Sequence, residues 1–314
     1  MGTKEKLLTL LESRKGIYLS GEELAASLSV SRAAVWKAVN ALRKEGDAIE
    51  AGTNRGYCLN SDTDILSLPG IREELSVRGL DITLLPTARS TNDLLRRRAE
   101  ERAPEGTVVM ALTQSAGKGR SGREFFSPPD TGLYFSILLR PQQDGITTMA
   151  AAAMCETLAY LGAEDPGIKW VNDLFVKGKK VCGILTEGAF SMETGRLEYA
   201  VLGVGLNLYA PREGFPGELA AVAGPAFKER QPGLKNRLTA EFLNRFFRYY
   251  RGQGDYVSVY RSHSLATGRR VEVLRGEESR KALVLGIDDS CRLRVRYDDG
   301  EEASLSYGEI RIRL

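Results

Sequence analysis

Apolar residues recur at helical spacing near the start of the chain, and the pattern predicts two helices before residue 30. The first helix has an apolar stripe of four leucines, Leu7, Leu8, Leu10 and Leu11. After a turn at Lys15 and Gly16, Ser20 is placed to cap a short helix from Glu22 to Leu28. Glu23, three residues after Ser20, completes the sequence pattern of a capping box.

A third helix is predicted from Arg32 to Glu45, with Ser31 at its start. Its buried side is expected to consist of Ala34, Val35, Ala38, Val39 and Leu42. The segment 48–59 then alternates and carries turn residues between Gly52 and Gly56, which predicts a β-wing. Two short helices joined by a tight turn and followed by a wing are typical of a winged helix-turn-helix.

The charge of the third helix indicates what this unit binds. The helix carries four cations before its first acid, Glu45. Five residues are expected on or near its outer face, where they can reach phosphates and base edges of DNA: Ser31, Arg32, Trp36, Lys37 and Asn40. Arg55 on the wing is expected to add a backbone contact. A protein-interaction module can have the same charge, but the order of turn, basic helix and wing favours DNA binding.

The pattern changes after residue 62. Between Leu80 and about Tyr260 strands and helices are mixed, as in an α/β or α+β catalytic domain. The predicted strands are 82–85, 108–113, 133–139, 180–187 and 199–208, and the predicted helices are 91–102, 147–161 and 236–250. The last fifty residues read as short alternating strands separated by Gly and Asp turns, which predicts a small SH3-like β-barrel.

We therefore predict an α+β multidomain chain with three parts. Residues 1–62 form a winged helix-turn-helix that binds DNA, residues 63–265 a mixed-sheet catalytic domain, and residues 266–314 an SH3-like C-terminal domain.

Composition narrows the chemistry without changing this division. The 314 residues carry a net charge of +3 and are 42% hydrophobic, which is typical of a globular protein with two or three domains. No apolar run is long enough to span a membrane, and the charged N-terminus lacks a signal-peptide core, so we expect a cytoplasmic protein without membrane contact. Four widely spaced cysteines and a single histidine argue against a disulfide framework, a catalytic triad or a protein-held metal. Chemistry is therefore expected from Lys, Arg, Asp and backbone amides.

The segment GKGRSGR at 117–123 is the strongest chemical signal in the chain. Its glycines satisfy GxGxxG, but the next residues, EFFSPP at 124–129, cannot begin the helix that a dinucleotide-binding fold requires. The chain also contains no P-loop motif. Glycines let backbone amides approach an oxyanion closely, and three cations can neutralise it: Lys118, Arg120 and Arg123. We predict an acyl-phosphate or nucleotide-phosphate loop rather than a flexible basic surface loop.

A second group of polar residues lies between 169 and 180. Asn172 and Asp173 follow an apolar segment, and Lys179 and Lys180 begin the next predicted strand. Each pair has a plain structural use, the first in a turn and the second in a soluble hairpin. Together with the glycine loop, they favour one shared site.

These motifs jointly resemble the bifunctional biotin–protein ligases that also repress the biotin operon. The matching segments are Ser90-Thr91-Asn92, Gln114, 117–123, KWVNDL at 169–174, Lys180 to Leu185 and GVGLNL at 203–208. With both flanking domains, the resemblance covers essentially the whole chain. It implies a central domain like that of class II aminoacyl-tRNA synthetases. It also implies two steps: biotin and Mg-ATP give biotinyl-5′-AMP, and a lysine of a biotin carboxyl carrier protein then takes the biotin.

The resemblance implies roles for individual residues. The catalytic residues would be Lys180, which bridges the biotin carboxylate and the α-phosphate, Arg120, which holds the adenylate, and Asp173, which orients the incoming lysine or a cation. The implied biotin contacts are Ser90, Thr91, Asn92, Gln114, Lys118, Gly119, Arg120, Lys180 and Gly183. The implied ATP contacts are Arg120, Arg123, Asn172, Lys180 and Asn207. Biotin is the implied substrate, and ATP with Mg²⁺ the co-substrate, with no metal site built from protein ligands.

The implied partners are the carrier protein of an acetyl-CoA or pyruvate carboxylase, operator DNA of biotin genes, and a second copy of the chain in the adenylate-bound form. Two alternatives stay open. A lipoate–protein ligase uses the same chemistry, but it would not need a polar set such as residues 90–92 with Gln114, which suits a ureido group. A ligand-sensing repressor without enzymatic activity would not need Arg120 and Lys180 together.

Overall fold

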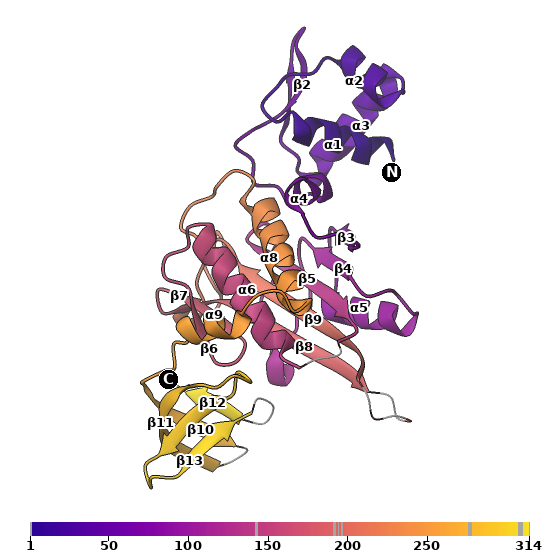
Figure 1. Ribbon diagram of the computed structural model, residues 1–314. Helices are drawn as coiled ribbons and strands as arrows, with labels where there is room; N and C mark the ends of the chain where they lie inside the picture. Colours follow the sequence, from indigo (N-terminus) through magenta and orange to yellow (C-terminus); the bar gives the residue numbers. More distant parts are fainter. Residues whose placement is uncertain are drawn as a thin grey trace. The chain divides into compact units, whose positions relative to one another are not determined.

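The computed structural model describes residues 2–141, 144–190, 193, 195, 197–275, 278–306 and 310–313, and Figure 1 shows the course of the chain. The chain divides into two compact units. The first comprises Met1–Ser76 and Glu229–Glu241, and the second comprises Val77–Lys228 and Phe242–Leu314. Within the described residues, no helix has both the length and the apolar character needed to cross a bilayer.

The first unit begins with the predicted helices and hairpin. Its elements are α1 (Thr3–Ser13), α2 (Gly21–Leu28), α3 (Arg32–Glu45), β1 (Ile49–Gly52), β2 (Gly56–Leu59) and α4 (Leu68–Glu74). The core joins the three predicted apolar stripes through Leu7, Leu11, Leu24, Val35, Val39 and Leu42, all buried. Ala34 was expected on the buried side of the third helix and is only half-buried. The short helix α4 was not predicted.

Short polar residues set the ends of α2 and α3. The side chains of Ser20 and Ser31 each accept a hydrogen bond from a backbone N–H three residues further on, which is N-cap geometry. Ser29 ends α2 in the left-handed conformation, and Gly46 (φ +103°) ends α3. These caps produce the tight α2–α3 turn.

The wing depends on one glycine. Gly56 has a φ of +99°, and a Cβ there would lie 2.1 Å from the carbonyl oxygen of Leu19. Leu19 and Tyr57 exchange both backbone hydrogen bonds, at 2.9 and 2.8 Å, so the segment before α2 pairs with β2. The glycine therefore allows the hairpin to approach the helical core.

The second unit is built on a seven-stranded mixed sheet in the order β3-β4-β5-β9-β8-β7-β6. The strands are β3 (Asp81–Leu85), β4 (Thr107–Ala111), β5 (Gly132–Leu139), β6 (Gly167–Lys169), β7 (Asp173–Val176), β8 (Lys179–Phe190) and β9 (Leu197–Asn207). Only the β3–β4 pair of this sheet is parallel. The predicted mixed sheet is thus confirmed, although β6 and β7 were not predicted as strands.

Helices pack on this sheet at several places (Figure 1). α5 (Thr91–Glu100) contacts β4, β5 and β9, and α6 (Ile146–Tyr160) contacts β6, β7 and β8. α6 is apolar on nearly all sides and is almost wholly buried, as expected for a core helix. Three further helices are α7 (Leu219–Val222), α8 (Leu234–Tyr250) and α9 (Tyr256–Ser262), of which only α8 was predicted.

The C-terminal segment forms an antiparallel sheet in the order β13-β12-β11-β10-β14. Its strands are β10 (Arg270–Arg275), β11 (Glu278–Ile287), β12 (Leu293–Tyr297), β13 (Glu302–Leu305) and β14 (Ile310–Arg313). Burial alternates strictly along β12, which is the period-2 pattern expected of a half-buried strand. Four of these strands were predicted, and β14 is additional.

Candidate active site and DNA-binding surface

The glycine loop lies between β4 and β5 and folds back on itself. The backbone N–H of Gly119 donates to the carbonyl of Arg123 at 2.7 Å, and that of Phe125 donates to Gly117 at 2.8 Å. A Cβ on Gly117 would lie 2.5 Å from the Phe125 carbonyl oxygen, so this position requires glycine. A three-residue 3₁₀ turn over 120–122 is followed by extended backbone. The prediction that no dinucleotide-type helix opens here is therefore confirmed.

Side-chain contacts hold the loop on two sides. The guanidinium of Arg120 donates to the amide oxygen of Asn172 at 3.0 Å. The ammonium of Lys118 donates to Asp93 in the first turn of α5 at 2.5 Å. Arg123 is exposed. The loop is thereby connected both to α5 and to the turn before β7.

The three predicted catalytic residues come together through Asn172. Asn172 donates to the Asp173 carboxylate at 3.1 Å and to the carbonyl of Ile184 at 2.9 Å. The Lys180 ammonium lies 2.7 Å from the same carboxylate oxygen, and both side chains are partly accessible to solvent. A continuous run of contacts therefore leads from Arg120 through Asn172 and Asp173 to Lys180.

An aromatic ring covers the strands beside Lys180. A Cβ on Gly205 would lie 2.6 Å from the Phe125 ring, and one on Gly183 would lie 3.3 Å from the ring and 3.5 Å from the Lys180 side chain. The two glycines face each other across β8 and β9. Their lack of side chains makes room for Phe125, which therefore forms an apolar surface beside a cation.

Four of the residues predicted to bind biotin lie at or beside the start of α5: Ser90, Thr91, Asn92 and Gln114. Ser90 caps the helix by accepting from the Asp93 N–H at 3.4 Å. Thr91 donates to the Gln114 side-chain oxygen from its backbone N–H at 2.8 Å and from its hydroxyl at 3.1 Å. Gln114 in turn donates to the Ser127 hydroxyl at 2.9 Å. Three of the four predicted residues are thus connected with one another or with the same helix turn.

Two further polar residues complete this network, and sequence reasoning missed both. The Ser136 hydroxyl lies 2.6 Å from the Asn92 amide oxygen and 2.8 Å from the Thr91 hydroxyl. The Asn92 amide nitrogen donates to the Glu187 carboxylate at 2.7 Å. Ser136 is fully buried on β5, and Glu187 lies on β8. For Ser136, the sequence offers one signal, which is a single serine inside the apolar run GLYFSILL at 132–139.

Asn207 lies at the end of β9 and is connected to Lys180 through the backbone after α7. Its carbonyl accepts from the Ala226 N–H at 2.8 Å, and the Lys180 carbonyl accepts from the Gly224 N–H at 3.0 Å. The segment 223–226 thus connects the strand ends that carry Asn207 and Lys180.

A hollow of about 430 Å³ adjoins the predicted biotin segment and is lined by Leu85, Thr87, Ala88, Arg89, Ser90, Asp93, Leu94 and Arg97.

One cysteine lies close to Lys180, and its pKa decides whether it can act as a nucleophile. Burial raises the pKa of the Cys182 thiol far above its usual value, so this cysteine, two residues from Lys180, is not a thiolate nucleophile. In the part of the chain that the structure describes, His, Cys, Asp and Glu side chains form no cluster of three or more that could hold a metal ion.

The predicted DNA-binding residues lie on α3 and the wing. Arg32, Trp36 and Lys37 are exposed, and Trp36 has 58% of its surface accessible, which is unusual for tryptophan. Asn40 is half-buried, and Ser31 caps the helix with its hydroxyl. On the wing, the Arg55 guanidinium lies over the Tyr18 ring at 3.9 Å, so its position is set by a cation–π contact.

Family models describe the class of protein that carries this fold and site. Residues 84–207 match the biotin/lipoate A/B protein ligase family, residues 3–58 match a helix-turn-helix domain, and residues 267–313 match the biotin protein ligase C-terminal domain. The chain therefore has the parts of a protein ligase with a DNA-binding module.

Individual relatives are more specific. The chain is 31% identical to the bifunctional ligase/repressor BirA of Bacillus subtilis over 95% of both chains. It is 30% identical to the Escherichia coli bifunctional ligase/repressor BirA over 98% of this chain and 96% of that one. The fold matches the Aquifex aeolicus biotin protein ligase in complex with biotin and ATP, with a TM-score of 0.62 and 22% identity over 74% of this chain and 98% of that chain. The chain belongs to the biotin protein ligase family, in its group of bifunctional ligase/repressors.

Proposed function

We propose that the protein is an ATP-dependent biotin–protein ligase that also represses biotin genes through its N-terminal helix-turn-helix. In the first step biotin and ATP give biotinyl-5′-AMP and pyrophosphate. In the second, the ε-amine of a lysine on a biotin carboxyl carrier protein attacks the mixed anhydride and AMP leaves. The observation that carries the ligase proposal is the run of contacts from Arg120 to Lys180, which joins the glycine loop to the β7–β8 hairpin.

The residues suit these steps without a side-chain nucleophile. On this proposal, Lys180 and Arg120 place positive charge where the biotin carboxylate and the α-phosphate meet, and this charge stabilises the transition state. Asn172 accepts a hydrogen bond from Arg120 and donates one to Asp173, and so fixes these two side chains relative to each other. Asp173 orients the incoming lysine by accepting a hydrogen bond from its amine, and Arg123 and Asn207 contact the nucleotide.

The polar network at the start of α5 supports biotin as the acid. Biotin has an apolar bicycle with a ureido group, which needs donors and acceptors inside an otherwise apolar pocket. On this proposal, Ser90, Thr91, Asn92 and Gln114 bind that group, while Lys118, Gly119 and Gly183 contact the rest of the ligand. The buried, hydrogen-bonded state of residues 90–92 favours a pre-formed polar site over the plain hydrophobic pocket that lipoate would need.

Magnesium fits this site as part of the nucleotide. Mg²⁺ prefers substrate phosphates, water and only one or two carboxylates over a full set of protein ligands. Asp173, whose carboxylate lies 2.7 Å from the Lys180 ammonium, is the residue that would contact the ion. When bound, Mg²⁺ neutralises charge on the triphosphate. The protein's own contribution is to orient Lys180, Arg120 and Asn172.

The ligase proposal is tested by mixing the protein with Mg-ATP and either biotin or lipoate, and measuring acyl-adenylate by mass spectrometry. We expect biotinyl-adenylate, and we expect Lys180→Ala to slow its formation by about 10²–10³-fold, as for removal of one transition-state donor. Lys177→Ala is the matched control, because Lys177 lies in the same hairpin but pairs with the exposed Glu164. Lipoyl-adenylate without biotinyl-adenylate would show that lipoate, and not biotin, is the substrate. Absence of adenylate with both acids would refute the ligase proposal.

The repressor half rests on the exposed basic face of α3. On this proposal, Arg32, Lys37 and Asn40 contact phosphates or base edges, Trp36 packs against sugar or a thymine methyl, and Arg55 contacts the backbone from the wing. Repressors of this architecture bind two-fold operators as dimers, so a second copy of the chain is the expected partner on DNA. The adenylate-bound form is the form that we expect to dimerise and bind.

A gel shift with the operator upstream of the biotin genes tests this half separately. We expect retardation that requires biotin and ATP and is lost in Trp36→Ala, while adenylate formation is unchanged. Absence of retardation at low salt would leave the ligase without a repressor function.

We further propose that the C-terminal sheet closes as an SH3-like barrel and that the central sheet is of the class II aminoacyl-tRNA synthetase type. The carrier protein would belong to an acetyl-CoA or pyruvate carboxylase, and the protein would act in the cytoplasm. The five-stranded antiparallel order with a bulge in β11 is compatible with barrel closure.

A further inference from the structure

A hollow of about 570 Å³ lies away from the candidate active site, at the far end of the elements that carry it. Arg102 follows the end of α5, whose first turn holds the predicted biotin residues, about 15 Å away at 1.5 Å per residue. Tyr199 lies near the start of β9, whose last residue is Asn207, about 26 Å away at 3.3 Å per residue. The hollow is therefore distinct from the catalytic residues.

Arg140 is fixed at this hollow by the main chain. Its guanidinium donates to the carbonyl of Glu198 at 3.2 Å and to that of Ala103 at 3.2 Å. Among the described residues, no carboxylate forms an ion pair with it. A guanidinium has five N–H donors in one plane, so main-chain anchoring leaves donors and the full charge for another group.

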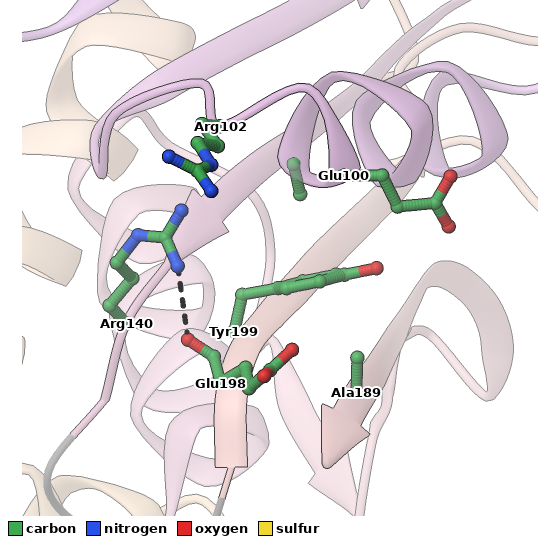
Figure 2. A pocket seen from close by; sticks show the side chains of 7 residues that line it. Glu100, Arg102, Arg140, Ala189, Glu198 and Tyr199 are labelled. Atoms are coloured by element: carbon green, nitrogen blue, oxygen red, sulfur yellow. Dashed lines mark hydrogen bonds between the residues drawn. The ribbon is translucent and has the colours of Figure 1, made fainter. Parts of the chain in front are cut away.

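Arg102 supplies a second cation on the same side of the hollow. Its φ of +65° is left-handed and holds the side chain beyond the end of α5. The described part of the chain offers its guanidinium no carboxylate partner. Figure 2 shows the two guanidinium groups turned toward each other. Two like charges in this arrangement repel, and an anion between them would reverse the sign of the interaction.

The remaining walls define the rest of a ligand. Tyr199 is 7% exposed, and Figure 2 shows its ring lying across the hollow. The carboxylate of Glu100 points away from the two guanidinium groups, and the Glu198 side chain lies on the other side of the ring (Figure 2). The acids disfavour a second anionic group, while the largely buried Tyr199 forms the floor of the hollow and leaves only a small part of its surface accessible.

We infer that this hollow is a second ligand site, which binds a small organic anion with one carboxylate or phosphate group. Arg102 and Arg140 bind the anionic group in a charge-assisted, forked geometry above the floor that Tyr199 forms. The inference does not depend on the proposed ligase function.

Phenyl phosphate is the probe, because it carries a single phosphate group on a small organic body. Isothermal titration of the full-length protein is expected to show saturable binding at one site of this kind, weakened at least tenfold by Arg140→Gln and by Arg102→Asn. Asparagine tolerates the left-handed backbone at 102, and Arg102 makes no described side-chain contact, so this variant keeps the fold. Arg78→Gln, which removes another exposed arginine of the same unit, is the matched control and is expected to bind normally.

The phosphate-binding loop is a competing site, and Arg120→Ala separates the two. Binding that survives Arg120→Ala but is lost in Arg102→Asn supports the inference. Binding that is lost in Arg120→Ala and kept in Arg102→Asn overturns it, as does the absence of saturable binding. Binding that disappears as protein concentration rises would mean that a second copy covers the hollow, which also overturns the assignment of a small ligand.

Discussion

Replacing Gly203 with alanine tests whether the buried network around Asn92 sets the affinity for biotin. Gly203 lies on β9 without a left-handed φ, so alanine adds no backbone strain. A Cβ there would lie 2.1 Å from the Asn92 amide oxygen, far inside van der Waals contact. Asn92 must therefore leave the position in which it contacts Ser136 at 2.6 Å and Glu187 at 2.7 Å.

The expected cost follows from these contacts. Each buried hydrogen bond contributes about 1 kcal/mol, and a buried polar group left unpaired costs about 1–3 kcal/mol. Overpacking adds about 1–3 kcal/mol. Together, the unpaired group and the overpacking lower the expected free energy of unfolding of the second unit by about 2–6 kcal/mol. Because Asn92 and Thr91 share the first turn of α5, we expect the affinity for biotin to fall at least tenfold, or about 1.4 kcal/mol.

Calorimetry with biotin and urea unfolding monitored by tryptophan fluorescence measure the two effects. Trp170 is buried in the second unit and reports its unfolding, whereas Trp36 is exposed on the first. Ser136→Ala is the matched variant, because it removes the hydroxyl without displacing Asn92, and its biotin affinity should fall less. A folded Gly203→Ala protein that binds biotin as tightly as the wild type would refute the reasoning.

Three further predictions concern other parts of the chain. Gly56→Ala should weaken operator binding in a gel shift and leave adenylate formation unchanged, because a Cβ would meet the Leu19 carbonyl at 2.1 Å and the φ is +99°. Folded protein should resist iodoacetamide at Cys182 at pH 8, since burial raises the pKa of this thiol; rapid labelling seen by peptide mass mapping would contradict this. Burial raises the pKa of Tyr134 to about 12, so the folded state holds this proton after the unfolded state has lost it, and stability should fall as the pH rises from 10 to 12. The urea midpoint of Tyr134→Phe should fall less over that range.

Local signals were enough for the helices and the wing of residues 3–59 but not for the sheet of the second unit. Serine caps, leucine spacing and the glycine turn of the wing each act within a few residues, so the sequence predicts their positions well. The strands β6 and β7 are only three and four residues long and lie at one end of the sheet order. β7 pairs with β8 and β6 pairs with β7, and no periodic pattern of three or four residues reveals such pairing.

The candidate site shows the same division. The glycine loop and the segment 169–180 carry motifs that stand out in the sequence, and the structure brings them into contact through Arg120 and Asn172. Ser136 and Glu187 lie on different strands, far from α5 along the chain, and acquire their partners only when the sheet forms. A single polar residue within a strand gives no indication of its partner, so this half of the network needed the structure.

Three cations of the candidate site each have a partner inside the protein. Lys118 pairs with Asp93, Arg120 with Asn172, and Lys180 with Asp173. Side chains held in this way need less ordering when an anion replaces the partner, so more of the interaction energy remains for the transition state.

The Lys180–Asp173 pair further suggests an order of events on the proposed function. While Asp173 pairs with Lys180, its Oδ1 contacts both Lys180 and Asn172, so most of its negative charge is already compensated and it attracts another ammonium group weakly. The acyl carbonyl and the phosphate of the acyl-adenylate compete for Lys180 and thereby release Asp173. The lysine of the carrier protein then finds an anion to orient its amine only after the activated acid is in place. The same ion pair would thus hold Lys180 ready for the first step and delay the second until the adenylate has formed.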